Sequence, residues 1–463
     1  MTYASRSLDT VGNWICCLKL YDSLSPIPER TALNNFCASP KNNKDRLPRD
    51  NLFNRKTRWP AYLSDSKIKH SLHRVSDFDF EKDAFRNNFY FIELDFVYPN
   101  HFGDIGGNLI SPAIVEANRA GILNIVFDYA SEAYNLFQQD WFSRIIKECK
   151  RHNLNPNCCY LISGDLNIRN QYSIWKKIEP EISQNFNMTV IADDHFHNAY
   201  RKQVKARMYL RSGEGINAVP PSGRKTKDFL CFNAAARGHR LLLVADLSRL
   251  GLLEKNNVSL LYRHDPNNYE TLKQIIPERV ENVLNGLFSS WDSSRKEYIR
   301  NFYRAPKPIN LDLTRDMVRK DDRITPTNLY EETFFSLVTE TEFSPSNALF
   351  PTEKLFKPIA YFHPIILMAQ PGTLKYLKRV GYETFPEMFD ESYDTIENPV
   401  ERYQAVLDQV INWTNLPKEE KKQRYNSVIP KLRRNRKLFL SGDNMDVYPN
   451  PAKVLLTTVK SNL

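Results

Sequence analysis

Short apolar runs alternate with helical patterns through the first half of the chain. Each of the first three runs precedes a stretch of helical periodicity. The runs are Phe89–Val97, Asn124–Ala130, Cys159–Asp165 and Met188–Asp194. Strands that are covered by helices on both faces of a parallel sheet read as continuous apolar runs. The pattern therefore predicts an α/β fold whose first domain is Rossmann-like.

A second series of strands and helices follows a polar, basic stretch at 199–228, which contains two prolines and three glycines. Its predicted strands are Asp228–Ala234, Val258–Arg263, Phe335–Val338 and Pro364–Met368. We therefore predict two Rossmann-like domains, at 85–215 and 216–415. An irregular extension with short elements, 1–84, precedes them, and C-terminal helices with a tail, 416–463, follow them.

The tripeptide Thr352-Glu353-Lys354 opens a predicted helix that follows an apolar strand. A helix start offers free backbone N–H groups and the positive end of the helix dipole, which together bind phosphate. Lys354 and Lys357 would add positive charge, and Glu353 would accept hydrogen bonds from ribose hydroxyls. The alternative is an ordinary capped amphipathic helix, because Thr is a common N-cap residue. The flanking strands favour a sugar-nucleotide site.

These residues resemble the C-terminal domain of GT-B glycosyltransferases, most closely the α1,3-fucosyltransferase and exostosin-like group. The matching features are an apolar strand, a glutamate in a polar loop, a Thr-Glu-Lys helix start, and a proline with a second apolar strand. They correspond to Phe335–Val338, Glu340, Thr352-Glu353-Lys354 and Pro364–Met368. The sequence differs in having Lys357-Pro358 within the helix and His363 before the second proline.

The resemblance implies two domains that face a central cleft, with the acceptor on the first domain and a nucleotide sugar on the second. It implies an inverting, metal-independent transfer of a sugar from a nucleoside-diphosphate donor, with a GDP-sugar favoured, to a glycan or other hydroxyl acceptor. No cofactor beyond the donor substrate is expected.

The segment after the strand Asp228–Ala234 offers groups for a diphosphate. Ligands of open parallel sheets bind beyond the carboxyl ends of the strands, and Asn233, Arg237 and Arg240 lie at such an end. Arginine binds diphosphates bidentately, and two arginines at a helix start oppose the helix dipole unless an anion is present. The alternative is that neither arginine binds a ligand, so that Arg240 is an ordinary first-turn residue of an amphipathic helix and Arg237 is a loop residue.

An inverting transferase needs a base that deprotonates the acceptor hydroxyl. In the first domain, Asp128 and Glu132 lie four residues apart at a strand-to-helix junction, and they are the preferred candidates. Asp104, in a glycine-rich loop, is the next candidate.

The segment Asp193–His197 has the sequence Asp-Asp-His-Phe-His, which also suits a divalent metal ion. It supports an alternative function, a metal-dependent phosphoesterase or nuclease that uses the strand-end Asp and His residues. A helix-capping or domain-bridging role without metal is favoured, and no metal site is predicted.

Composition sets the remaining limits. The chain has 463 residues, 41% of them hydrophobic, so it is long enough for two cores. Seven cysteines without CxxC spacing indicate reduced thiols and a cytoplasmic protein. A net charge of +10 favours acidic partners, which include nucleotides, an anionic membrane surface in peripheral contact, or nucleic acid bound by a non-catalytic protein. No specific nucleic acid is predicted, and no apolar run is long enough for a transmembrane helix.

Overall fold

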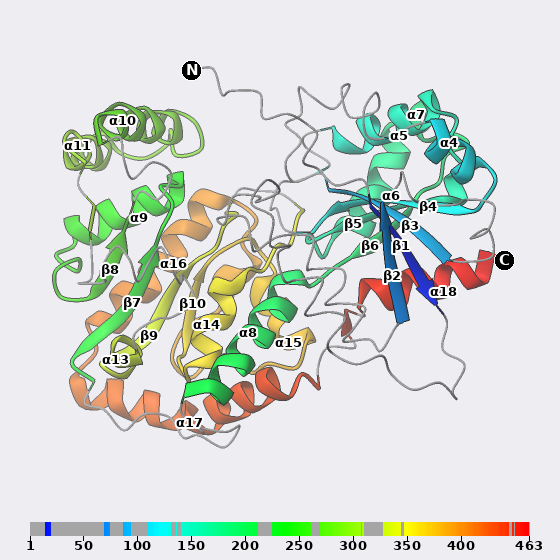
Figure 1. Ribbon diagram of the computed structural model, residues 1–463. Coiled ribbons are helices and arrows are strands. Elements are labelled where there is room, and N and C mark those ends of the chain that lie inside the picture. The colour runs from blue at the N-terminus through cyan, green and yellow to red at the C-terminus, as the bar shows by residue number, and fades with distance from the viewer. Residues whose placement is uncertain are drawn as a thin grey trace, which may run out of the picture. The chain divides into compact units, whose positions relative to one another are not determined.

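A computed structural model describes most of the chain. The described residues are 14–19, 69–74, 87–93, 110, 112–130, 136, 140–211, 225–261, 269–306, 308–309, 327–343, 347–443, 447–448 and 450–462. They form two compact units, one within 1–193 and 448–463 and the other within 194–447. Each unit has its own sheet with helices packed on it (Figure 1). The predicted α/β fold class, with two parallel-sheet domains, is confirmed at this level.

The first unit contains a six-stranded sheet in the order β2-β1-β3-β4-β5-β6. The strands are β1 (Trp14–Lys19), β2 (Lys69–Arg74), β3 (Asn87–Glu93), β4 (Leu123–Tyr129), β5 (Cys159–Ser163) and β6 (Thr189–Ala192). The last four are parallel, as their apolar runs predict. The first two come from the predicted N-terminal extension, where β1 pairs antiparallel with both β2 and β3.

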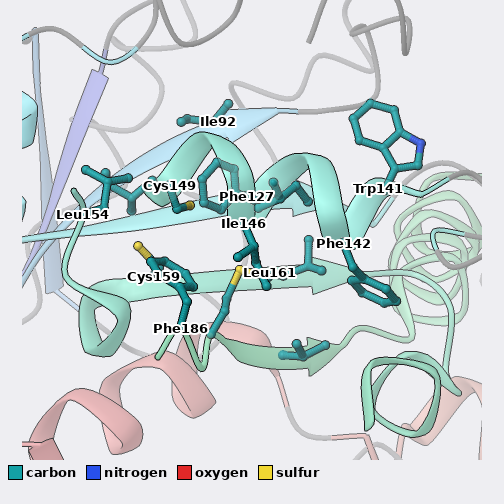
Figure 2. Close-up of a cluster of buried hydrophobic side chains, with 14 of the residues drawn as sticks. Ile92, Phe127, Trp141, Phe142, Ile146, Cys149, Leu154, Cys159, Leu161 and Phe186 are labelled. Carbon is teal, nitrogen blue, oxygen red and sulfur yellow. The ribbon is translucent and has the colours of Figure 1, made fainter. Parts of the chain in front are cut away.

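Helices cover both faces of the parallel strands in the first unit. They are α4 (Pro112–Arg119), α5 (Trp141–Arg151), α6 (Ile168–Ile178), α7 (Pro180–Ser183) and α18 (Pro451–Asn462), with a 3-10 turn, η6 (Pro156–Cys158). On one face, Phe127 and Leu161 pack with Phe142 and Ile146 of α5 (Figure 2). On the other face, a separate cluster includes Leu455 of α18. Every residue of β4 is buried, and five of its seven residues are apolar, as expected for a strand that is covered on both faces.

The second unit contains a four-stranded parallel sheet in the order β10-β9-β7-β8. The strands are β7 (Lys227–Asn233), β8 (Asn257–Leu260), β9 (Thr333–Thr339) and β10 (Ile365–Met368). All seven residues of β9 are buried. Helices α9 (Gly238–Arg249), α10 (Tyr269–Asn285) and α11 (Ser293–Phe302) pack together. Another group is formed by α8 (His195–Arg211), α14 (Glu353–Ala360) and α17 (Lys418–Ser441).

The remaining elements of the second unit surround β9 and β10. They are α13 (Thr327–Glu331), α15 (Thr373–Arg379), the 3-10 turn η7 (Ser392–Thr395) and α16 (Pro399–Thr414). Among the described helices, none combines the length and the apolar character needed to cross a membrane.

The chain passes between the two units at positions that differ from the predicted boundaries. The second unit begins at Asp194, whereas the sequence analysis places the boundary at 215/216. The helix α8 causes the difference, because it packs on α14 and α17. At the C-terminus, α17 belongs to the second unit, and residues 448–463 belong to the first. The segment that returns to the first unit is therefore α18, whose Leu455 is fully buried there.

Candidate functional site

The order of the strands in the second unit marks one position for a ligand. The chain runs from β7 outward to β8, and then returns to β9 on the other side of β7. Ligands of open parallel sheets bind beyond the carboxyl ends of the strands where the order reverses in this way. The last residue of β7 is Asn233, and the last residue of β9 is Thr339. The candidate site therefore lies beyond these two residues.

Glu340 follows β9 directly and joins the starts of two helices. Its carboxylate accepts hydrogen bonds from Thr352 N at 3.0 Å, Thr352 Oγ1 at 2.6 Å and Thr341 N at 3.0 Å. Its backbone carbonyl accepts from His239 Nε2 at 3.0 Å and Arg240 Nη2 at 2.9 Å. Glu340 is only 2% exposed, so water does not compete strongly for these bonds. The starts of α9 and α14 are thus fixed at one strand end.

The start of α14 carries the predicted Thr-Glu-Lys side chains. Thr352 is the N-cap, and its Oγ1 accepts a hydrogen bond from Lys354 N. Lys354 Nζ donates to Thr341 Oγ1 at 3.2 Å, Thr352 Oγ1 at 3.1 Å and Glu353 Oε1 at 3.0 Å. The side chains of Lys354 and Glu353 are 25% and 30% exposed, so both are accessible to a ligand. Lys357 lies one turn further along the helix and is half-buried.

Glu353 is held in its charged form. Burial raises the pKa of this carboxyl group, but the charges of Lys354 and Lys357 and the hydrogen bond from Lys354 outweigh burial and lower the pKa to about 2. Glu353 is therefore a carboxylate at neutral pH, and it can accept hydrogen bonds from the hydroxyl groups of a ligand.

Arg240 and His239 are buried at the start of α9. Arg240 Nη2 donates to the backbone carbonyl oxygens of Thr339 and Glu340, at 3.0 and 2.9 Å. Burial and the charge of Arg237 lower the pKa of Arg240 to about 10. Burial and the charge of Arg240 lower the pKa of His239 well below its ordinary value, so its neutral ring donates through Nε2. These contacts favour a positioning role for Arg240, whereas the sequence pattern predicted that Arg240 binds a diphosphate.

Asn233 is also buried and connects the two strand ends. Its Oδ1 accepts a hydrogen bond from Thr339 Oγ1 at 2.7 Å, and its Nδ2 donates to Cys231 Sγ at 3.3 Å. The side chain therefore fixes the end of β7 beside the end of β9, and it lies beneath the surface that a ligand would contact.

Arg237 reaches the surface beside two residues that the sequence analysis did not identify. Arg237 is the N-cap residue of α9, and its Nη1 donates to Glu342 Oε1 at 3.0 Å. Arg279, an exposed residue of α10, donates through Nη1 to Ala236 O at 3.0 Å. Arg237 therefore ends the loop 234–237, and Arg279 contacts the same loop from α10. Arg279 could not be identified from sequence, because nothing in a helical pattern shows which strand end the helix contacts.

Of the three predicted base candidates, the structure describes one. Asp128 lies near the carboxyl end of β4, as predicted, and is 1% exposed. Its Oδ1 accepts a hydrogen bond from Ala130 N at 3.2 Å. Glu132 and Asp104 lie outside the described residues.

The segment that suggested a metal site anchors α8 within the second unit. Asp194 Oδ2 accepts hydrogen bonds from Tyr376 Oη at 2.5 Å and from His197 Nδ1 at 3.0 Å. His197 Nε2 lies 2.7 Å from Tyr382 Oη, and its ring stacks on Phe356 of α14 with centroids 4.2 Å apart. Within the described parts of the chain, no three His, Cys, Asp or Glu side chains lie together as a metal site requires.

Other distinctive residues lie away from this site. His363 bonds to Thr333 O at 2.8 Å and Ser336 Oγ at 2.7 Å, toward the amino end of β9. Asp394, in the 3-10 turn η7, accepts hydrogen bonds from Leu374 N and Lys375 N at the start of α15. Surface hollows of about 370 Å³ beside Trp413 and about 280 Å³ in the first unit are not lined by any residue of the candidate site.

Comparison with known proteins gives no further guide. Neither a scan against protein-family models nor a search of curated protein sequences finds a match to this chain. The function is therefore inferred from the site and from the sequence pattern.

Proposed function

We propose that this chain is a GT-B-like glycosyltransferase, which moves a sugar from a nucleoside-diphosphate donor to a hydroxyl acceptor. The observation that carries the proposal is the set of hydrogen bonds around Glu340. Through this residue, the starts of α9 and α14 are held at the strand ends where the sheet order reverses. Helix starts at such an edge are suited to bind phosphate groups.

In this proposal, positive side chains at the helix starts bind the diphosphate. Lys354 Nζ is held by three oxygen atoms at the start of α14, and Arg237 lies at the start of α9. Arg279 adds a third cation beside the loop 234–237. Glu353, which is ionised, accepts hydrogen bonds from the ribose hydroxyls. A GDP-sugar remains the favoured donor, on the resemblance to fucosyltransferases.

The proposed reaction is a single displacement at the anomeric carbon. A general base takes the proton of the acceptor hydroxyl, and Asp128 remains the sequence-based candidate among the described residues. The acceptor oxygen forms a bond to the anomeric carbon as the bond between that carbon and the diphosphate oxygen breaks. Lys354 and the arginines stabilise the negative charge that develops on the departing nucleoside diphosphate, so no metal ion is required.

Replacement of one cation tests this proposal. We expect Lys354→Ala to weaken GDP binding by about 10- to 100-fold, because a charged hydrogen-bond donor to the diphosphate is lost. The matched control is Lys422→Ala, because Lys422 is an exposed lysine that pairs with Glu419 on α17. Calorimetric titration measures both variants against the wild type. Equal GDP affinity in the wild type and in Lys354→Ala would contradict the proposed role.

A further inference from the structure

An ion pair crosses the candidate site between the two strand ends. Arg237 follows β7, and Glu342 follows β9 by three residues. Arg237 Nη1 lies 3.0 Å from Glu342 Oε1, and the two side chains are 40% and 22% exposed. The guanidinium of Arg237, which the proposed function assigns to the diphosphate, is therefore already paired with the carboxylate of Glu342.

Such a pair is easily opened by a stronger anion. Partly exposed ion pairs contribute little to stability, because water screens the attraction and both side chains lose conformational freedom. A diphosphate carries more charge than a carboxylate and can bind a guanidinium through two parallel hydrogen bonds. Glu342 would meanwhile repel any anion that enters beside it. A ligand must therefore supply enough charge to compensate for both effects.

We propose that Glu342 is a specificity-determining residue, an internal anion that holds Arg237 until a polyanion displaces it. The inference rests on the proposed donor site and adds that a ligand must carry enough negative charge to displace Glu342 from Arg237. A diphosphate carries enough charge, whereas singly charged anions do not and are excluded. Glu342 thereby lowers the affinity of the site for every phosphate ligand.

The test compares charge removal at Glu342 with the same change at a similar ion pair elsewhere. We expect Glu342→Gln to bind inorganic pyrophosphate and GDP about fivefold more tightly than the wild type, measured by calorimetry on the full chain. The control is Glu420→Gln, which opens the pair between Glu420 and Arg424 on α17, with side chains 38% and 39% exposed. The control variant should bind both ligands as the wild type does.

A double-mutant cycle shows whether Glu342 acts through Arg237. In an Arg237→Gln background, we expect Glu342→Gln to lose most of its effect on affinity, because the guanidinium that it releases is absent. An undiminished effect in that background would overturn the inference. Glu342→Ala provides a second variant in case the amide side chain disturbs folding.

The outcomes separate this inference from the proposed function. If the wild type binds GDP but Glu342→Gln binds it no more tightly, the inference fails and the proposed donor site stands. If no nucleoside diphosphate binds the wild type but Glu342→Gln gains pyrophosphate binding, the inference stands and the glycosyltransferase proposal fails. Pyrophosphate binding by neither form overturns the inference.

Discussion

His239 and His363 are both buried and both held neutral by their surroundings. Burial is the main cause for each, and nearby positive charges, from Arg240 and from Lys225, lower the pKa further. His239 belongs to the candidate site, where its neutral ring donates to Glu340 O. His363 belongs to the opposite end of the sheet, where it bonds to Thr333 and Ser336.

Because the pKa values of these two histidines are lowered, we predict that the protein loses stability in mild acid. Their pKa values are lowered in the folded state, so below about pH 6.5 the unfolded chain binds protons that the folded chain does not. We expect the free energy of unfolding to fall by about 1.4 kcal/mol per pH unit for each histidine as the pH drops further. Urea titrations from pH 7.5 to 5 measure the slope. A His363→Gln variant with an unchanged slope would contradict the assignment.

At the scale of elements, the bond between Glu340 and Thr352 joins β9 to the start of α14. Thr352 is both the N-cap of the helix and a hydrogen-bond donor to a buried carboxylate. We expect Thr352→Val to lower the free energy of unfolding by about 2–4 kcal/mol, because the cap is lost and Glu340 loses a partner. Thr457→Val on α18 is the control, because it removes only an exposed hydroxyl bond to Lys453 O. Equal stabilities of the two variants by urea titration would contradict this account.

The close approach of α9 and α10 depends on a glycine. A Cβ atom at Gly238 would lie 2.3 Å from Val283 Cγ2, which is far inside van der Waals contact. We expect Gly238→Ala to cost about 1–3 kcal/mol of stability, because the helices must separate. Val283→Ala in the same variant should restore part of the loss, and thermal unfolding measures both. A Gly238→Ala variant as stable as the wild type would show that the helices are not packed so closely.

The elements that sequence predicted are those with a clear local pattern. β4 and β9 are buried along their whole length, and most residues of each strand are apolar. β1 and β2 lie in a segment without a sustained period, and the pairing of β1 with β2 and β3 joins residues far apart in the chain. The start of α14 at Glu353 was likewise readable, because its N-cap and flanking strands are local features.

At the scale of the whole molecule, the sequence indicated two parallel sheets, but its predicted boundary between them, at 215/216, differs from the observed start of the second unit at Asp194. The order in which β9 lies beside β7 arises from long-range pairing, which local periodicity does not encode. The same limit applies to Glu342 and Arg279, whose contacts with Arg237 and Ala236 join residues 105 and 43 positions apart. The polar, basic stretch 199–228 suggested a domain boundary, whereas packing on α14 and α17 makes α8 part of the second unit.

The most direct test of the central claim is a thermal-shift screen against GDP, UDP, ADP, CDP and dTDP, with and without magnesium or manganese. A ligand that binds only the folded state stabilises it by about 2.7 kcal/mol at 100 times its dissociation constant. We predict that one diphosphate, GDP first, raises the melting temperature selectively and without metal. No response to any nucleotide, or a response to metal alone, would contradict the proposed glycosyltransferase.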